Sequence, residues 1–147
     1  MIYLEYEQYK ARYRFLQERF EKVLLEKEIL FTRTLPNAIR YDRDQVQTSI
    51  DGNVLDDYVI SLEEQKIDET LDHIRTSLKD WQILIDLKEN ELRKSKDKYD
   101  RVYLLRFIDG IGINRIAREM SYSRAQIYRI LRQIERKIPK HETKCDK

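Results

Sequence analysis

The sequence predicts an all-α protein in which a long N-terminal coiled-coil helical hairpin precedes a small helix-turn-helix domain. The 147 residues include only 3 Gly and 2 Pro, so few turns are available for a fold of many strands. Apolar residues recur at coiled-coil spacing in two long segments. The last third of the chain is basic, and there two short helical patterns flank a tight turn.

The first long segment has apolar residues at alternating spacings of four and three. Because no Gly or Pro precedes Pro36, we expect one continuous helix over about residues 2–31. One cation, Lys27, lies in the seam and is predicted to set the register at some loss of stability. The seam positions are Ile2, Tyr6, Tyr9, Tyr13, Leu16, Phe20, Val23, Lys27 and Leu30.

The second long segment repeats this spacing and carries its own seam cation, Lys88. Ser61 and Glu64 have the spacing of a capping box, which predicts a helix that starts near Ser61, or alternatively near Leu55, and continues to about Lys94. The other seam positions are Ile60, Glu64, Ile67, Leu71, Ile74, Leu78, Trp81, Ile85 and Leu92.

Residues 33–58 connect the two segments and are predicted to form a mobile crossover, or to hold a short turn of helix. They contain two turn-forming sequences, Pro36-Asn37 and Asp51-Gly52-Asn53. Two long helices joined in this way can pair within one chain or between two chains, and the heptads fit both arrangements. We predict that residues 1–94 form a homo-oligomer, a dimer or tetramer, through Tyr9, Tyr13, Leu16, Phe20, Val23, Leu71, Ile74, Leu78, Trp81 and Ile85.

Charge is distributed unevenly along the chain. Residues 94–147 contain 15 Lys or Arg and 7 Asp or Glu, a net charge of +8, whereas residues 1–93 carry −6. This asymmetry favours a polyanion-binding head on a separate body, although a solvated lysine-rich face would give the same count.

The head, residues 95–140, has the pattern of a helix-turn-helix. A short helix is predicted over 97–108, a second over 113–120 and a third from Arg124 to about Ile138, where Pro139 ends it. Gly110 and Gly112 separate the first two helices, and the turn 121–123 separates the last two, with Ser123 as N-cap of the third. An ordinary three-helix bundle with a charged surface is the alternative.

The third helix is predicted to contact double-stranded DNA. Arg124, Gln126 and Arg129 are predicted to read base edges, because they lie in the first two turns, on the side expected to be opposite Ile127 and Ile130. Arg132 and Arg136 further along would contact phosphates. The predicted inward face is Ile127, Ile130, Leu131 and Ile134. The predicted DNA-binding residues are Ser123, Arg124, Gln126, Tyr128, Arg129, Arg132 and Arg136.

Residues 103–110 (YLLRFIDG), 116–124 (IAREMSYSR) and 127–130 (IYRI) resemble region 4 of bacterial sigma-70-type factors, the part that reads the −35 promoter element. Two positions depart from that family: Gly112 stands where Ser or Thr usually caps a helix, and Ser121 stands where Gly is common in the turn. With its long N-terminal coiled coil, the whole chain resembles phage late-gene transcriptional regulators of the RinA/ArpU type. The resemblance implies an activator of phage or prophage late genes, with host RNA polymerase as a partner.

Two other classes of protein combine similar parts. A small terminase subunit, which recognises DNA for phage genome packaging, also joins a helix-turn-helix to an oligomerising coiled coil, and a structural adaptor would use the head to bind protein. An enzyme is not expected, because the sequence has no Gly-rich phosphate loop and no G-x-S-x-G. We expect no cofactor.

The sequence also lacks the usual signs of a metal site, a disulfide framework or membrane attachment. One cysteine, Cys145, lies in a polar tail, residues 141–147, and His73 and His141 are far apart, so we expect no metal site and no disulfide within the chain. There is no signal-peptide pattern and no long apolar run, so we expect a cytoplasmic protein without a membrane span.

Overall fold

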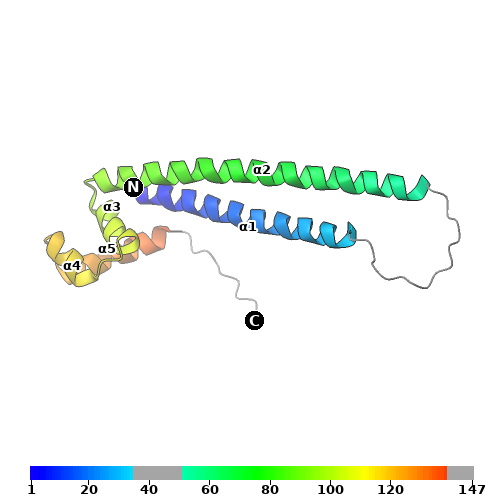
Figure 1. Cartoon of the computed structure of the whole chain (residues 1–147). Coiled ribbons are helices and arrows are strands. Elements are labelled where there is room, and N and C mark those ends of the chain that lie inside the picture. The colour runs from blue at the N-terminus through cyan, green and yellow to red at the C-terminus, as the bar shows by residue number, and fades with distance from the viewer. Residues whose placement is uncertain (35–50, 139–147) are drawn as a thin grey trace, which may run out of the picture. The chain divides into compact units, whose positions relative to one another are not determined.

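The computed structural model describes residues 1–34 and 51–138, and throughout these ranges it contains helices and no strand. The all-α class predicted from the sequence is therefore confirmed for the described residues. In chain order the elements are α1 (Ile2–Thr34), α2 (Asp51–Lys94), α3 (Lys98–Tyr103), the π-helical turn η1 (Leu104–Ile108), α4 (Ile113–Glu119) and α5 (Arg124–Lys137) (Figure 1). They form two compact units, one made of Met1–Arg12 with the chain from Trp81 onward, and one made of Tyr13–Asp80.

The long helices begin and end close to the predicted positions at three of their four ends. The exception is the start of α2, which lies at Asp51, so Ser61 is inside the helix and the predicted cap there is wrong. The turn predicted at residues 51–53 is wrong for the same reason, because these residues are helical. Extending an existing helix costs much less free energy than nucleating one, so a four-residue capping pattern does not by itself start a helix. The other predicted turn, Pro36-Asn37, lies outside the described residues.

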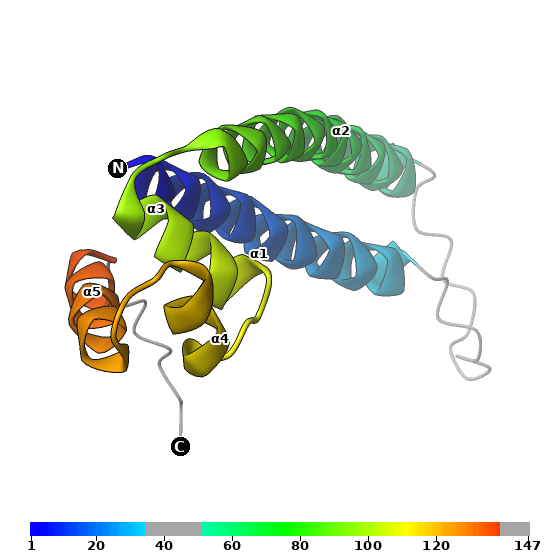
Figure 2. The same cartoon turned by 90° about the vertical axis from the view of Figure 1, so that its left-hand side faces the viewer.

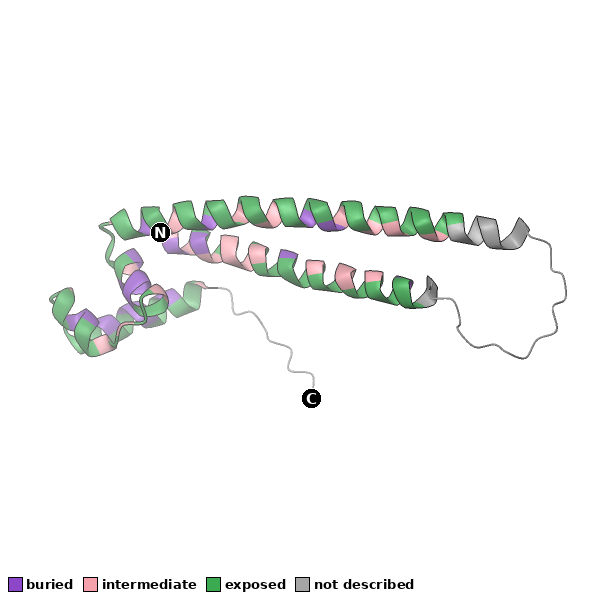
Figure 3. Cartoon of the chain, viewed as in Figure 1, coloured by how far each residue is buried: buried purple, intermediate pink, exposed green. Residues whose placement is uncertain are grey.

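In the unit Tyr13–Asp80, α1 and α2 contact each other through both apolar and charged side chains. The Lys27 ammonium lies 2.6 Å from the Asp68 carboxylate, and the Arg75 guanidinium lies over the Phe20 ring at 5.5 Å from its centroid. The partners' numbers rise along α1 and fall along α2, so the two segments run antiparallel. Each predicted seam position in this unit is buried or half-buried, and Leu16, Leu30, Leu71 and Ile74 are the most buried. Figure 3 shows buried and intermediate residues at intervals along both helices.

In the other unit, the first residues of α1 contact the last turns of α2. The Tyr9 and Trp81 rings meet edge to face at 5.4 Å. The seam cation Lys88 lies 2.7 Å from Glu5 on α1 and 2.8 Å from Glu91 on its own helix. The hydrogen bond from Lys88 lowers the pKa of the Glu5 carboxyl below its ordinary value of 4.5. The pair therefore adds stability above that pH, and this contribution is lost as the pH falls through the lowered pKa.

The N-terminal residues of α1 also form part of the core of the basic head. Tyr3 is fully buried, and its ring stacks on that of Tyr103 at 5.3 Å. The Tyr3 backbone N–H donates to buried Asp100 at 3.1 Å, which also accepts from the Ser95 hydroxyl at 2.9 Å. The Tyr103 hydroxyl donates to Glu7. This compact unit is therefore larger than the segment 95–140 that the sequence delimited.

The helix predicted over 97–108 consists of α3 followed by η1. In η1 the Asp109 N–H donates to the Leu104 carbonyl at 2.9 Å, five residues back, which is the widened pattern of a π turn. Gly110 follows with φ of 67°, a left-handed conformation that glycine adopts without steric cost. The Ile111 N–H then reaches back to the Leu105 carbonyl at 2.8 Å and closes the end of the helix.

The turn between α4 and α5 satisfies the last carbonyls of α4. The Tyr122 N–H donates to the Ala117 carbonyl at 2.9 Å and the Ser121 N–H to the Arg118 carbonyl at 3.3 Å, the pair of bonds that defines a Schellman motif. Ser121 has φ of 56°. Glycine is favoured at such a position, which is where the sequence departs from the sigma-factor pattern. After this turn α5 packs against both α4 and α3 (Figure 2).

Replacing Ser121 with glycine is expected to stabilise the protein. A left-handed backbone costs a non-glycine residue about 1–2 kcal/mol, and the greater freedom of glycine in the unfolded chain offsets part of the gain. We expect an increase of about 0.5–1 kcal/mol in the free energy of unfolding, measured by urea denaturation. Gly110→Ala is the matched control, since it places a side chain at φ of 67° and should destabilise by a similar amount. An unchanged midpoint for both variants would contradict this account.

Candidate nucleic-acid interface

The helix α5 is strongly amphipathic, and its apolar side fixes which side faces solvent. Ile127, Ile130, Leu131 and Ile134, the four residues predicted to face inward, are all buried. The remaining surface of the helix is rich in cations, with five Lys or Arg against one Glu. Because the buried residues pack against α3 and α4, the charged side is held toward solvent by the core of the head.

Three arginines form a row on the exposed side of α5. With successive residues about 100° apart around a helix, Arg129, Arg132 and Arg136 lie within about 40° of the direction opposite Ile127. All three side chains are exposed. The sequence placed Arg129 with the base-reading residues and the other two with the phosphate contacts, and the structure brings them into one line along the helix.

The other predicted contact residues of α5 lie beside this row. Arg124 falls about 60° from Ile127, and Gln126 falls about 100° from it on the other flank. Their placement on the side opposite the core, which the sequence suggested for both, is therefore wrong. Both are exposed, as is Tyr128, whose side chain is 51% exposed. Arg129 is therefore the arginine nearest the N-terminus of α5 that lies on the side opposite the core.

Ser123 and Gln126 have structural roles at the start of α5. The Ser123 hydroxyl accepts from the Gln126 N–H at 3.2 Å, and the Gln126 side-chain oxygen accepts from the Ser123 N–H at 2.9 Å. This is a complete capping box, which gives two backbone N–H groups at the start of α5 a hydrogen-bond partner. The predicted N-cap at Ser123 is confirmed. The part played by Gln126 was missed, although its spacing from Ser123 is the signal of this motif.

Several basic residues outside the predicted set are exposed in the same compact unit. Arg115 and Arg118 lie on α4, and Lys137 lies in the last turn of α5. Lys98 at the start of α3 lies over the Tyr99 ring at 5.1 Å, and Lys137 approaches the same ring at 5.9 Å. Lys98 was not among the predicted contact residues, because it is far from α5 in sequence.

The residues predicted to mediate oligomerisation are turned inward in the single chain. Leu71, Ile74, Leu16 and Ile85 are buried, and the other six are half-buried. Side chains of the same chain provide some of this cover, as in the contact between Tyr9 and Trp81.

Over residues 1–34 and 51–138, no three His, Cys, Asp or Glu side chains are grouped closely enough to hold a metal ion. Within the same ranges no helix is both long and apolar enough to cross a membrane. The tail residues His141 and Cys145 lie outside the described part of the chain. Comparisons of the chain with protein-family models, curated proteins and solved structures found no match.

Proposed function

We propose that this chain is a sequence-specific regulator of transcription that binds double-stranded DNA. In this proposal α4 and α5 form a helix-turn-helix, and α5 is the recognition helix. The observation that carries it is the row Arg129, Arg132 and Arg136, which is exposed along the side of α5 opposite a buried apolar side.

The dimensions and chemistry of α5 suit the major groove of DNA. A helix of 14 residues is about 21 Å long, and the groove, about 12 Å wide, admits a helix with its side chains. Arginine offers paired donors that match the O6 and N7 acceptors of guanine. The capping box stabilises the first turn, and Arg129 lies one turn further along the helix.

The resemblance to sigma-factor region 4 and to phage late-gene regulators supports a more specific role. We propose an activator of phage or prophage late genes that acts in the cytoplasm with host RNA polymerase as a partner. The coiled-coil hairpin of α1 and α2 would pair two or four chains. Joining two heads raises the effective concentration of the second head at its half-site and strengthens binding without new contacts.

The test is to select preferred duplexes from a random library and then to titrate variants against a selected and a random duplex. Arg129→Ala is expected to weaken binding to the selected duplex by about 1–3 kcal/mol and to relax the preference at one base position. Arg136→Ala is expected to weaken binding to both duplexes alike. It should also lower the slope of log affinity against log salt concentration by roughly one. Lys22→Ala, an exposed site on α1, is the control. The absence of any salt-dependent binding to DNA would refute the proposal.

A further inference from the structure

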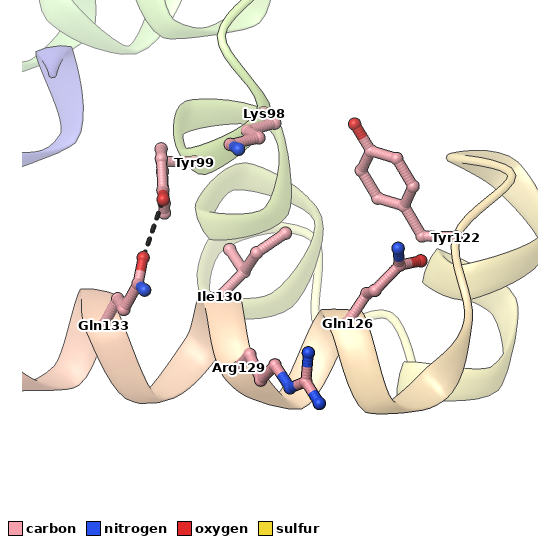
Figure 4. Close-up of a pocket in the computed structure, with 7 residues that line it drawn as sticks. All are labelled: Lys98, Tyr99, Tyr122, Gln126, Arg129, Ile130 and Gln133. Carbon is pink, nitrogen blue, oxygen red and sulfur yellow. Dashed lines mark hydrogen bonds between the residues drawn. The ribbon is translucent and has the colours of Figure 1, made fainter.

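A pocket of about 250 Å³ lies on one flank of α5, beside the arginine row. Lys98 and Tyr99 of α3 form one wall, and α5 forms the other, with Tyr122 of the turn at one end (Figure 4). All of these residues belong to the same compact unit. The α5 side of the pocket is lined by Gln126, Arg129, Ile130 and Gln133.

The polar groups that line this pocket are mostly hydrogen-bond donors. The Gln126 side-chain oxygen accepts from the Ser123 N–H at 2.9 Å, and a backbone N–H can only donate, so this bond leaves the Gln126 NH₂ group available to a ligand. The Gln133 oxygen likewise accepts from the Tyr99 hydroxyl at 2.7 Å, which leaves its NH₂ group available (Figure 4). Lys98 contributes donors that carry positive charge, and Arg129, which faces the bases in the proposed function, borders the pocket on the side of the arginine row.

The charges of the lining residues are also of one sign. Lys98 and Arg129 are cationic, and no carboxylate is among the residues that line the pocket. The Lys137 ammonium lies 5.9 Å from the centroid of the Tyr99 ring, which forms part of the wall. Donor groups with positive charge and no competing acceptor bind an anion, and oxygens of a phosphate accept such bonds strongly.

We infer that this pocket binds a backbone phosphodiester of the DNA that α5 contacts. This inference rests on the proposed function. Its place on the flank of α5 is where a strand bordering the groove would pass when the arginine row faces the bases. A phosphate held there fixes the rotation of α5 about its own axis, because the pocket joins α3 to α5. Such a contact positions the protein on DNA and carries no sequence preference.

The decisive comparison is Lys98→Ala against Lys96→Ala in the full-length protein. Both lysines are exposed, but only Lys98 lines the pocket. On a random-sequence duplex at several salt concentrations, Lys98→Ala is expected to lose about five- to tenfold in affinity and to lower the salt slope by roughly one. Lys96→Ala should change neither appreciably. Equal behaviour of the two variants would overturn the pocket assignment.

A second variant tests the donors without disturbing the fold. Gln126→Glu keeps the oxygen that caps Ser123, and glutamate is itself favoured at this capping position, but it replaces the NH₂ donor with an acceptor. We expect a wild-type melting temperature and a loss of affinity of tenfold or more for any sequence. Unchanged affinity would contradict the inference. If the wild-type chain itself binds no duplex, the proposed function fails; if it binds and the pocket variants match their control, only the pocket fails.

Discussion

Replacing Tyr3 with alanine is expected to lower the free energy of unfolding by about 3–5 kcal/mol, the cost of removing a large buried aromatic side chain. Tyr3 is fully buried although it is the third residue of the chain. Its ring stacks on Tyr103, which in turn stacks on Phe107 at 5.1 Å. The substitution therefore opens a cavity in the core of the head. Urea denaturation followed by circular dichroism measures the change.

Two further tyrosine substitutions separate the packing of Tyr3 from other effects. The Tyr3 hydroxyl is buried without a hydrogen-bond partner among the described residues, and this burial raises the pKa of the phenol. Tyr3→Phe keeps the ring and removes the unsatisfied group, so we expect a gain of about 1 kcal/mol. Tyr58→Ala, at a side chain that is 62% exposed, should stay within about 0.5 kcal/mol of wild type. A Tyr3→Ala variant as stable as Tyr58→Ala would show that the head folds without α1.

The contrast between Tyr3 and the seam residues shows how far the sequence determines this fold. Seam positions such as Leu16 and Leu71 were predictable because a helix turns apolar residues at spacings of three and four toward one side. Tyr3 breaks that spacing, and its partner Tyr103 is far away in sequence. The burial of Asp100 was not predictable either, because one of its hydrogen-bond donors is the backbone N–H of Tyr3, 97 residues away in sequence. A fragment that starts at about Lys94 would lack Tyr3, the side chain that stacks on Tyr103.

At the candidate interface, the capping role of Ser123 was predicted correctly, whereas the side of α5 on which Arg124 and Gln126 lie was not. Ser123 was recognised as a cap because a short hydroxyl side chain just before a helical pattern can accept a hydrogen bond from an N–H of the first turn. The flanks on which Arg124 and Gln126 lie follow from the 100° turn per residue and the predicted inward face, which includes Ile127. Applying that spacing residue by residue would have placed both beside the row, so this error lay in the reading of the pattern. The pocket involving Lys98 could not be predicted, because it requires two helices that are distant in sequence to lie side by side.

Ile74→Asp is expected to give the other large loss of stability, on the order of 4 kcal/mol. The Ile74 side chain is 4% exposed and lies in the seam of the unit Tyr13–Asp80. An aspartate there is left without a cation in an apolar contact, unlike Asp68, which pairs with Lys27. The same substitution at the half-buried seam positions Phe20 and Leu78 should cost less stability, because an aspartate there can reach water. His73→Asp, at the exposed neighbouring position, is the control and should stay within about 0.5 kcal/mol.

The mass of the Ile74→Asp variant decides whether the seam closes within one chain or between chains. If α1 and α2 of one chain cover Ile74, as the contacts between Lys27 and Asp68 and between Phe20 and Arg75 indicate, the variant loses stability and keeps the wild-type mass in light scattering. In that case, a wild-type oligomer must be held by other surfaces. If two chains exchange their helices, the same substitution breaks the assembly, and the mass and the melting temperature fall together. Cooperative DNA binding would be lost only if the helices are exchanged between chains, because only in that arrangement does the seam join two heads.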